Sequence, residues 1–206
     1  MGPVISVVSY GVGNVGSIFS MLRKIGAPAV AAATPSDIDQ AEKIILPGIG
    51  AFDHGMETLD ARGLVEPLRK RVTQDGVPIL GICLGMQLLG QRSEEGVRPG
   101  LALIDGHCER FRSNGHPPLK IPHMGWKELR FSRSGPLLNE LNAESRFYFV
   151  HSYHFVCDHV GDVLATAHYG IDFTAMVERA NVWGAQFHPE KSHRFGMTLL
   201  NNFAAL

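Results

Sequence analysis

The chain carries Val77-Pro78-Ile79-Leu80-Gly81-Ile82-Cys83-Leu84-Gly85, an apolar run that ends at a cysteine between two glycines. Residues 77–82 are typical of a buried strand, and residues 84–90 are typical of the start of a helix. Cys83 is therefore predicted to lie at the turn between them. A nucleophile elbow needs small residues two positions before and after the nucleophile, because the strained turn brings their backbones together. Gly81 and Gly85 meet that need, and the helix start would favour the thiolate form of Cys83.

The sequence around this unit predicts an α/β fold. Strand-like and helix-like segments alternate in the first half, as in parallel α/β proteins. In the second half, from 101 to 177, short β-like runs punctuated by Gly and Pro predict antiparallel strands. We expect an open, mainly parallel sheet with helices on both faces, and a smaller antiparallel β part. The predicted strands are 5–9, 28–33, 43–46, 101–104, 147–150, 164–167 and 182–187, and the predicted helices cover 15–25, with Asn14 as N-cap, and 64–72.

Length and composition indicate a compact enzyme domain. The chain has 206 residues, 45% of them hydrophobic, so we expect one domain, 1–206, with a sizeable core. Lys and Arg total 19 against 20 for Asp and Glu, and their dispersal predicts no nucleic-acid partner. No run of about 18 apolar residues indicates a membrane span. The three cysteines, Cys83, Cys108 and Cys157, are too few and too separated for a disulfide framework, which favours the cytoplasm.

A histidine and a carboxylate that could serve Cys83 follow a second apolar run. A free cysteine taken alone is most often a small buried hydrophobe. A cysteine nucleophile, however, needs a histidine base, and the base needs an orienting acid. His188 and Glu190 supply both, just beyond the strand predicted at 182–187, and the carboxyl ends of parallel strands are where α/β sheets place their sites.

One competing motif predicts a different function. Gly11-Val12-Gly13-Asn14-Val15-Gly16 has the spacing of a dinucleotide-binding fingerprint between a strand and a helix. That fingerprint also needs an acidic residue about 20 positions later, at the end of the next strand. Asp37 lies beyond Pro35 and is poorly placed for that role, so a nicotinamide oxidoreductase is a weak alternative.

Ten histidines raise the question of a metal site. His151 and His154 are three residues apart in a β-like segment, which would send them to opposite faces. His188 and His193 flank Glu190, but a base committed to a thiol cannot also bind a metal. We therefore expect no metal and no cofactor.

The motifs together resemble a known family. The segments 81–87 and 186–192 resemble those of class I, triad-type glutamine amidotransferases. Within that class, Pro122-His123-Met124-Gly125-Trp126 and Tyr148-Phe149-Val150-His151-Ser152-Tyr153 resemble the glutaminase subunits of imidazole glycerol phosphate synthases. The likeness covers residues 5–203, so an isolated coincidence of motifs is an inadequate explanation.

The resemblance implies a three-layer glutaminase fold and hydrolysis of glutamine to glutamate and ammonia. Cys83 would attack the side-chain amide, His188 would act as base and Glu190 would orient it. The tetrahedral oxyanion needs backbone donors, for which Leu84 and Ile49 are the candidates. The resemblance also implies glutamine contacts at Gly48, Gly50, Gln87, His151, Ser152 and Tyr153, and a partner interface at Asn14, Met124, Trp126 and Lys191.

The expected partner is a (β/α)₈-barrel cyclase subunit. The resulting heterodimer would combine hydrolase and lyase chemistry in histidine biosynthesis, passing ammonia to the synthesis of imidazole glycerol phosphate and an aminoimidazole carboxamide ribotide. Lys127 and the segments 154–157 and 191–197 instead resemble paralogues that supply ammonia to sugar amidotransferases of surface polysaccharides. A free-standing cysteine hydrolase of small amides and a non-catalytic binding module rank below both readings.

Overall fold

The computed structural model describes residues 2–112 and 119–206. Its first half alternates strands and helices as the sequence predicts. The elements are β1 (Ile5–Val8), α1 (Val15–Lys24), β2 (Ala29–Ala32), α2 (Pro35–Asp39), β3 (Lys43–Gly48), α3 (Phe52–Ala61), α4 (Val65–Thr73), β4 (Ile79–Cys83) and α5 (Leu84–Leu88). The Asn14 carboxamide caps α1, accepting from the Ser17 amide at 3.4 Å.

The second half is dominated by strands, again as predicted. The elements are β5 (Arg92–Ser93), β6 (Gly106–Arg110), β7 (His123–Glu128), β8 (Arg130–Phe131), η1 (Pro136–Leu138), β9 (Arg146–His151), β10 (Tyr153–Cys157), η2 (Val160–Asp162), β11 (Val163–Tyr169), β12 (Ile171–Arg179), β13 (Val182–Ala185), η3 (Pro189–Lys191) and α6 (His193–Ala205). Among the described residues, no helix is long and apolar enough to cross a bilayer.

Most strands belong to one sheet, which brings three distant segments to one edge. Its order is β2-β1-β3-β4-β13-β12-β10-β6-β5, with β8 and β11 joined beside β12. The strands β2, β1, β3, β4 and β13 run parallel to their neighbours along this row, whereas β12 is antiparallel to β13. Gly48 on β3 pairs with Cys83 on β4, and Ala185 on β13 pairs with Ile82. Chain leaving the ends of β3 and β13 therefore emerges beside Cys83.

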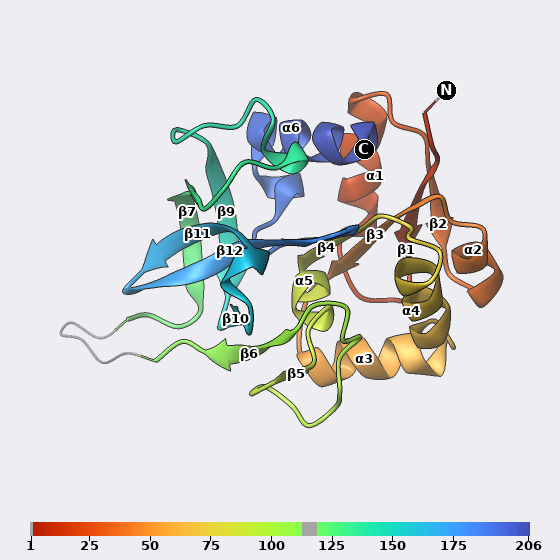
Figure 1. Ribbon diagram of the computed structural model, residues 1–206, viewed down its shortest axis with the longest axis horizontal. Helices are drawn as coiled ribbons and strands as arrows, with labels where there is room; N and C mark the ends of the chain where they lie inside the picture. Colours follow the sequence, from red (N-terminus) through yellow and green to blue (C-terminus); the bar gives the residue numbers. More distant parts are fainter. Residues whose placement is uncertain (1, 113–118) are drawn as a thin grey trace.

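Helices cover both faces of the sheet (Figure 1). One apolar core joins α1 and α6 to the sheet through residues such as Leu22, Leu200 and Phe203. The other joins α3, α4 and α5 to the opposite face through residues such as Leu59 and Leu68. The small antiparallel sheet of β7 and β9 lies beside β11 and β12 of the central sheet in Figure 1, and Phe149 of β9 packs against Phe173 of β12. The predicted three-layer fold with a smaller β part is confirmed.

The prediction of a strand at 101–104 is wrong. These residues form a loop in which Ala102 has a positive φ of 51°. The amides of Leu101, Ala102 and Leu103 donate to the carbonyls of Leu88, Gly90 and Leu89. The apolar run therefore covers the carboxyl end of α5 instead of joining a sheet, because the free carbonyls there take its backbone donors.

Two helices that we did not predict flank the third strand. A capping box starts α2. The Asp37 amide donates to the Thr34 hydroxyl oxygen, and the Thr34 amide donates to the Asp37 carboxylate. In α3, Phe52, Met56 and Leu59 are buried at helical spacing. Both signals are present in the sequence, but they are only one or two turns long.

Gly85 lies where the elbow helix packs on β3, and a side chain has no room there. A Cβ on Gly85 would overlap the Leu46 carbonyl oxygen, and one on Gly81 would lie 2.6 Å from the Gly85 oxygen. The two glycines are therefore required by close backbone approach, and neither has a positive φ. The spacing read from the sequence thus has a direct steric cause.

Gly85→Ala should destabilise the fold by about 3 kcal/mol, since the methyl group forces β3 and α5 apart. Gly16→Ala is the matched control, because Gly16 lies in α1 with nothing within 4 Å of its added Cβ. That control should be neutral or stabilise the fold by about 0.5–1 kcal/mol. Urea unfolding of both variants measures the difference, and equal stability of the two would contradict the steric account.

Candidate active site

Cys83 is held in a strained backbone conformation at the end of β4. Its φ of 54° and ψ of −110° lie outside the regions that L residues favour. The residue is buried, with 6% exposure, and α5 begins at the next residue. The predicted elbow is therefore present, with the thiol aimed from the strand end and the Leu84 amide directly after it.

His188 and Glu190 form a close pair that is shielded from water. The His188 Nδ1 lies 2.7 Å from Glu190 Oε1, and both side chains are 3% exposed. The backbone also fixes the histidine: its amide donates to the Tyr148 carbonyl at 2.9 Å, and its own carbonyl accepts from the Ser192 hydroxyl at 2.6 Å. The Glu190 carboxylate thus holds the ring, while two hydrogen bonds fix the backbone that carries it.

The charge on His188 is stabilised by its two neighbours. Burial acts to lower the pKa of His188, but the Cys83 side chain and the Glu190 carboxylate outweigh it and raise the pKa to about 10. The ring's other nitrogen, Nε2, is buried and has no hydrogen-bond partner within the described part of the chain, although the Cys83 side chain is near enough to raise the pKa of the ring. A protonated imidazole beside a cysteine is an arrangement that can activate the sulfur as a nucleophile.

A cavity of about 460 Å³ opens in front of these residues, a volume suited to a small molecule. Cys83 and His188 line this cavity. So do eight other residues that the sequence analysis named: Ile49, Gly50, Leu84, Gln87, His151, Ser152, Tyr153 and Lys191. Gly48 lies behind the wall, where an added Cβ would approach the Gly85 nitrogen to 2.9 Å. Glu190 lies behind His188.

Glu95 also lines the cavity, and sequence reasoning missed it. Its carboxylate accepts from the Phe52 amide at the start of α3, at 2.8 Å. Burial raises the pKa of Glu95, although the Phe52 amide works to lower it. No spacing rule marks this residue, because it reaches the cavity from a loop between β5 and β6.

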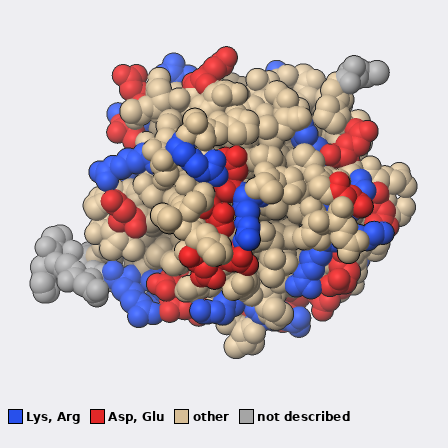
Figure 2. Space-filling view, viewed as in Figure 1, with Lys and Arg blue, Asp and Glu red and all other residues tan. Residues whose placement is uncertain are grey.

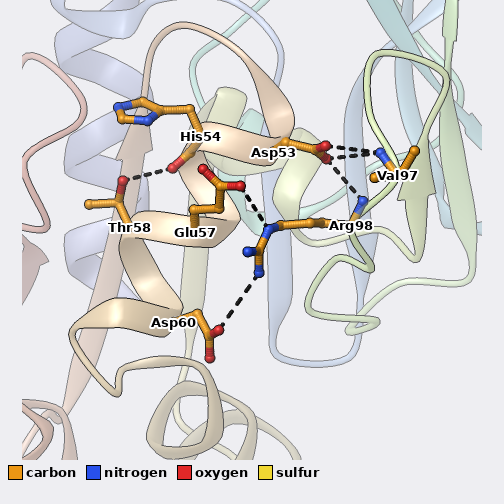
Figure 3. A network of polar contacts seen from close by, with 7 residues as sticks. All are labelled: Asp53, His54, Glu57, Thr58, Asp60, Val97 and Arg98. Atoms are coloured by element: carbon orange, nitrogen blue, oxygen red, sulfur yellow. Dashed lines mark hydrogen bonds and ion pairs between the residues drawn. The ribbon is translucent and has the colours of Figure 1, made fainter.

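A network of charges holds that loop against α3 (Figure 3). The Asp53 carboxylate accepts from the amides of Val97 and Arg98, at 3.0–3.1 Å. The Arg98 guanidinium pairs with Glu57 at 3.1 Å and with Asp60 at 3.7 Å. These contacts tie the loop to a helix of the rigid scaffold, so Glu95 is presented from a fixed position.

The expectation that His151 and His154 face opposite ways is wrong. Ser152 interrupts the strand between β9 and β10, and both rings contact Phe111, with centroids at 5.2 and 4.7 Å. His151 Nδ1 bonds the Tyr153 carbonyl at 2.8 Å, and its Nε2 lies 3.1 Å from His123 Nδ1. Burial lowers the pKa of His151 to about 3 and that of His123 to about 4. The pair is therefore neutral at pH 7.

Residues assigned to a partner interface are exposed next to the cavity. Met124 and Trp126, on one face of β7, are 62% and 43% exposed. Trp126 stacks on His193 with centroids 5.4 Å apart, and the Lys191 ammonium lies 5.5 Å from the Tyr148 ring. Asn14 is also exposed, at the start of α1, and this helix contacts η3, which contains Lys191.

Lys127 does not share the face of Met124 and Trp126. Successive residues of a strand point to opposite faces, and the Lys127 ammonium lies 5.6 Å from the Tyr169 ring. Its charge is therefore directed away from the exposed pair. Lys127 therefore gives less support to a sugar amidotransferase as the partner than the sequence suggested.

The glycine-rich loop lacks the acid that a dinucleotide site needs. The Asp37 carboxylate accepts from the amides of Ala33 and Thr34, both at 2.9 Å. It is consequently occupied in starting α2. An added Cβ on Gly13 would lie 3.2 Å from the Pro47 carbonyl carbon, so this loop packs on the strand that ends beside Cys83.

Comparison with known proteins agrees with this geometry. Residues 6–205 match the family Glutamine amidotransferase class-I. The chain belongs to this family. It is 51% identical to "Imidazole glycerol phosphate synthase subunit HisH 2" of Pseudomonas aeruginosa, over 98% of this chain and 100% of that protein. It is 48% identical to the protein of the same name from Methanococcus maripaludis, over 97% of this chain and 98% of that one.

A further relative and two solved structures extend the comparison. "Imidazole glycerol phosphate synthase subunit HisH" of Bdellovibrio bacteriovorus is 45% identical over 98% of this chain and 100% of that protein. PurLQS from Thermotoga maritima gives a TM-score of 0.75 at 20% identity, covering 98% of each chain. The crystal structure of another glutamine amidotransferase gives 0.70 at 20% identity, covering 98% of this chain and 99% of that one. These two structures share the fold.

Glu190→Gln should lower the pKa of His188, because a neutral amide cannot balance the imidazolium charge. The pKa of His188 is about 10 in the folded protein, so its favourable interactions stabilise the fold fully below about pH 6.5, where an unfolded histidine is also protonated. This stabilisation disappears as the pH rises toward 10. The stability difference between the wild type and the variant should therefore shrink between those pH values. NMR titration of His188 and urea unfolding at several pH values measure both effects.

Glu128→Gln is the control for this experiment, since Glu128 pairs with Arg146 on the surface. It should leave the titration of His188 unchanged. A His188 pKa that is the same in the wild type and in Glu190→Gln would contradict the assigned role of Glu190.

Proposed function

We propose that this chain is the glutaminase subunit of an imidazole glycerol phosphate synthase of histidine biosynthesis. The observation that carries the proposal is the shielded Cys83, His188 and Glu190 set at a cavity of suitable size. Relatives that are 45–51% identical over nearly their full length carry the name of that synthase's HisH subunit. The whole chain serves this reaction as one catalytic domain.

The reaction begins when the Cys83 thiolate attacks the side-chain carbonyl carbon of glutamine. The carbonyl oxygen becomes an oxyanion, stabilised by the amides of Leu84 and Ile49. The His188 imidazolium then donates its proton to the departing nitrogen, so ammonia leaves and a glutamyl thioester remains. Water, deprotonated by His188, attacks the thioester and releases glutamate and the free thiol. Glu190 keeps the imidazole oriented through both steps.

The polar groups around the cavity support glutamine as the substrate. The Glu95 carboxylate is suited to the α-ammonium group, because burial raises its pKa and a bound cation would offset that cost. Gly48 and Gly50 flank Ile49, while Gln87, His151, Ser152 and Tyr153 complete the glutamine site.

Ammonia released to water would be protonated and lost, so a second protein must receive it. We assign that role to a (β/α)₈-barrel cyclase that docks on Met124 and Trp126, with Lys191 and Asn14 at the same interface. Ring closure, which is lyase chemistry, belongs to this partner, so the lyase chemistry expected of the heterodimer is not a property of the present chain. A free thiol nucleophile favours a reducing compartment, which supports a cytoplasmic location.

Cys83→Ala should abolish glutamine-dependent synthesis by the reconstituted synthase and spare synthesis from added ammonium salts, because the residue serves only to release ammonia. Coupled assays with each nitrogen source measure the two activities. Cys157→Ser is the control, since Cys157 is half-buried on β10 away from the cavity. Its effect should be limited to a stability loss of about 1–3 kcal/mol. Parallel loss of both activities in Cys83→Ala would refute the nucleophile assignment.

Trp126→Ala should weaken partner binding by about 30-fold or more, because exposed aromatic anchors dominate interface energies. Ile171→Ala is the control: Ile171 is 41% exposed on β12 and is not part of the proposed interface. Titration calorimetry with the cyclase from the same genome measures both affinities. Failure of the wild-type chain to bind that cyclase, together with activation by a sugar amidotransferase, would overturn the histidine assignment and leave the glutaminase chemistry standing.

A further inference from the structure

Gln186 contacts the nucleophile from inside the protein. The residue follows β13 and has no exposed surface. Its Nε2 lies 3.9 Å from Cys83 Sγ, and its backbone amide donates to the Ala175 carbonyl at 2.9 Å. Gln186 is not among the residues that line the cavity. It therefore approaches the sulfur from behind, away from the space where a substrate would bind.

A chain of hydrogen bonds fixes which end of the Gln186 amide faces the sulfur. The Tyr153 backbone carbonyl, which can only accept, lies 3.0 Å from Gln87 Nε2. Gln87 must therefore turn its NH₂ group toward it, and the second hydrogen of that group meets Gln186 Oε1 at 3.0 Å. Gln186 is left with its own NH₂ group directed at Cys83.

The far end of this chain is also anchored. The Tyr153 carbonyl accepts a second bond from His151 Nδ1, at 2.8 Å, and His151 Nε2 faces His123 Nδ1 on β7. A neutral pair satisfies both contacts when His123 donates to His151 and His151 donates to Tyr153. The donor at the sulfur is consequently the last member of a network with only one consistent polarity.

We propose that Gln186 is a positioning residue for the glutaminase reaction, donating from its carboxamide to the Cys83 sulfur and holding it in the orientation for attack. This inference rests on the proposed function. His188 and Gln186 would fix the sulfur from two directions, leaving the cavity side open. The hydrogen bond from Gln186 to the Cys83 sulfur is long, at 3.9 Å, so it can weaken at little cost when the sulfur forms its bond to the substrate carbon and loses its negative charge.

Gln186→Met tests the proposal, because methionine keeps the shape and removes the donor. In the complex with the cyclase, kcat for glutamine should fall about tenfold or more while KM stays within about twofold, since misorientation of a nucleophile acts on the chemical step. Alkylation of Cys83 by iodoacetamide should slow by a similar factor. Ammonium-dependent synthesis should be unchanged. Gln91→Met, at an exposed glutamine, is the control for all of these measurements.

Gln87→Met provides a second variant should Gln186→Met fail to fold. It removes the group that orients Gln186 without touching the sulfur, so alkylation of Cys83 should again slow. An unchanged alkylation rate and kcat in a folded Gln186→Met protein would overturn the proposal. So would a rise in KM at constant kcat, or an equal loss of ammonium-dependent synthesis. Because alkylation needs neither glutamine nor a partner, it also tests the Gln186 contact if the glutaminase assignment itself fails.

Discussion

The close approach of two backbones at the elbow is the constraint on which the site depends. Gly85 lies so near the Leu46 carbonyl that no side chain fits between α5 and β3. This contact holds Cys83 in its strained conformation and brings the residues after Gly48 beside it. One packing contact in the middle of a buried sheet thus positions both the proposed nucleophile and the loop proposed to bind the oxyanion.

Charge in this buried place is maintained by pairing. His188 and Glu190 are almost fully shielded; burial lowers the pKa of His188, and the neighbouring Cys83 and Glu190 side chains outweigh it. On the face shown in Figure 2, acidic and basic side chains are intermingled, in keeping with a net charge of −1. The electrostatics that matter for the proposed chemistry are therefore local.

Short-range signals in the sequence were sufficient for the elbow and for the His188 and Glu190 pair, since each depends on neighbours within a few residues. The same local reasoning failed at 101–104, where an apolar run met the free carbonyls of α5 before it could meet a strand. It also failed at His154, because the break at Ser152 changes the alternation of side chains. Apolarity predicts burial, but the partner that buries a segment lies elsewhere in the chain.

The sequence by itself determined the elbow at Cys83, the nearby pair of His188 and Glu190 proposed to serve it, and the parallel sheet that carries them, because glycine spacing and apolar runs constrain the backbone directly. Only the tertiary structure decided that Glu95 reaches the cavity, that Lys127 faces away from Met124 and Trp126, and that Gln186 lies behind the sulfur. Those placements depend on loops and strand pairs that join residues far apart in the chain, and no local spacing encodes them.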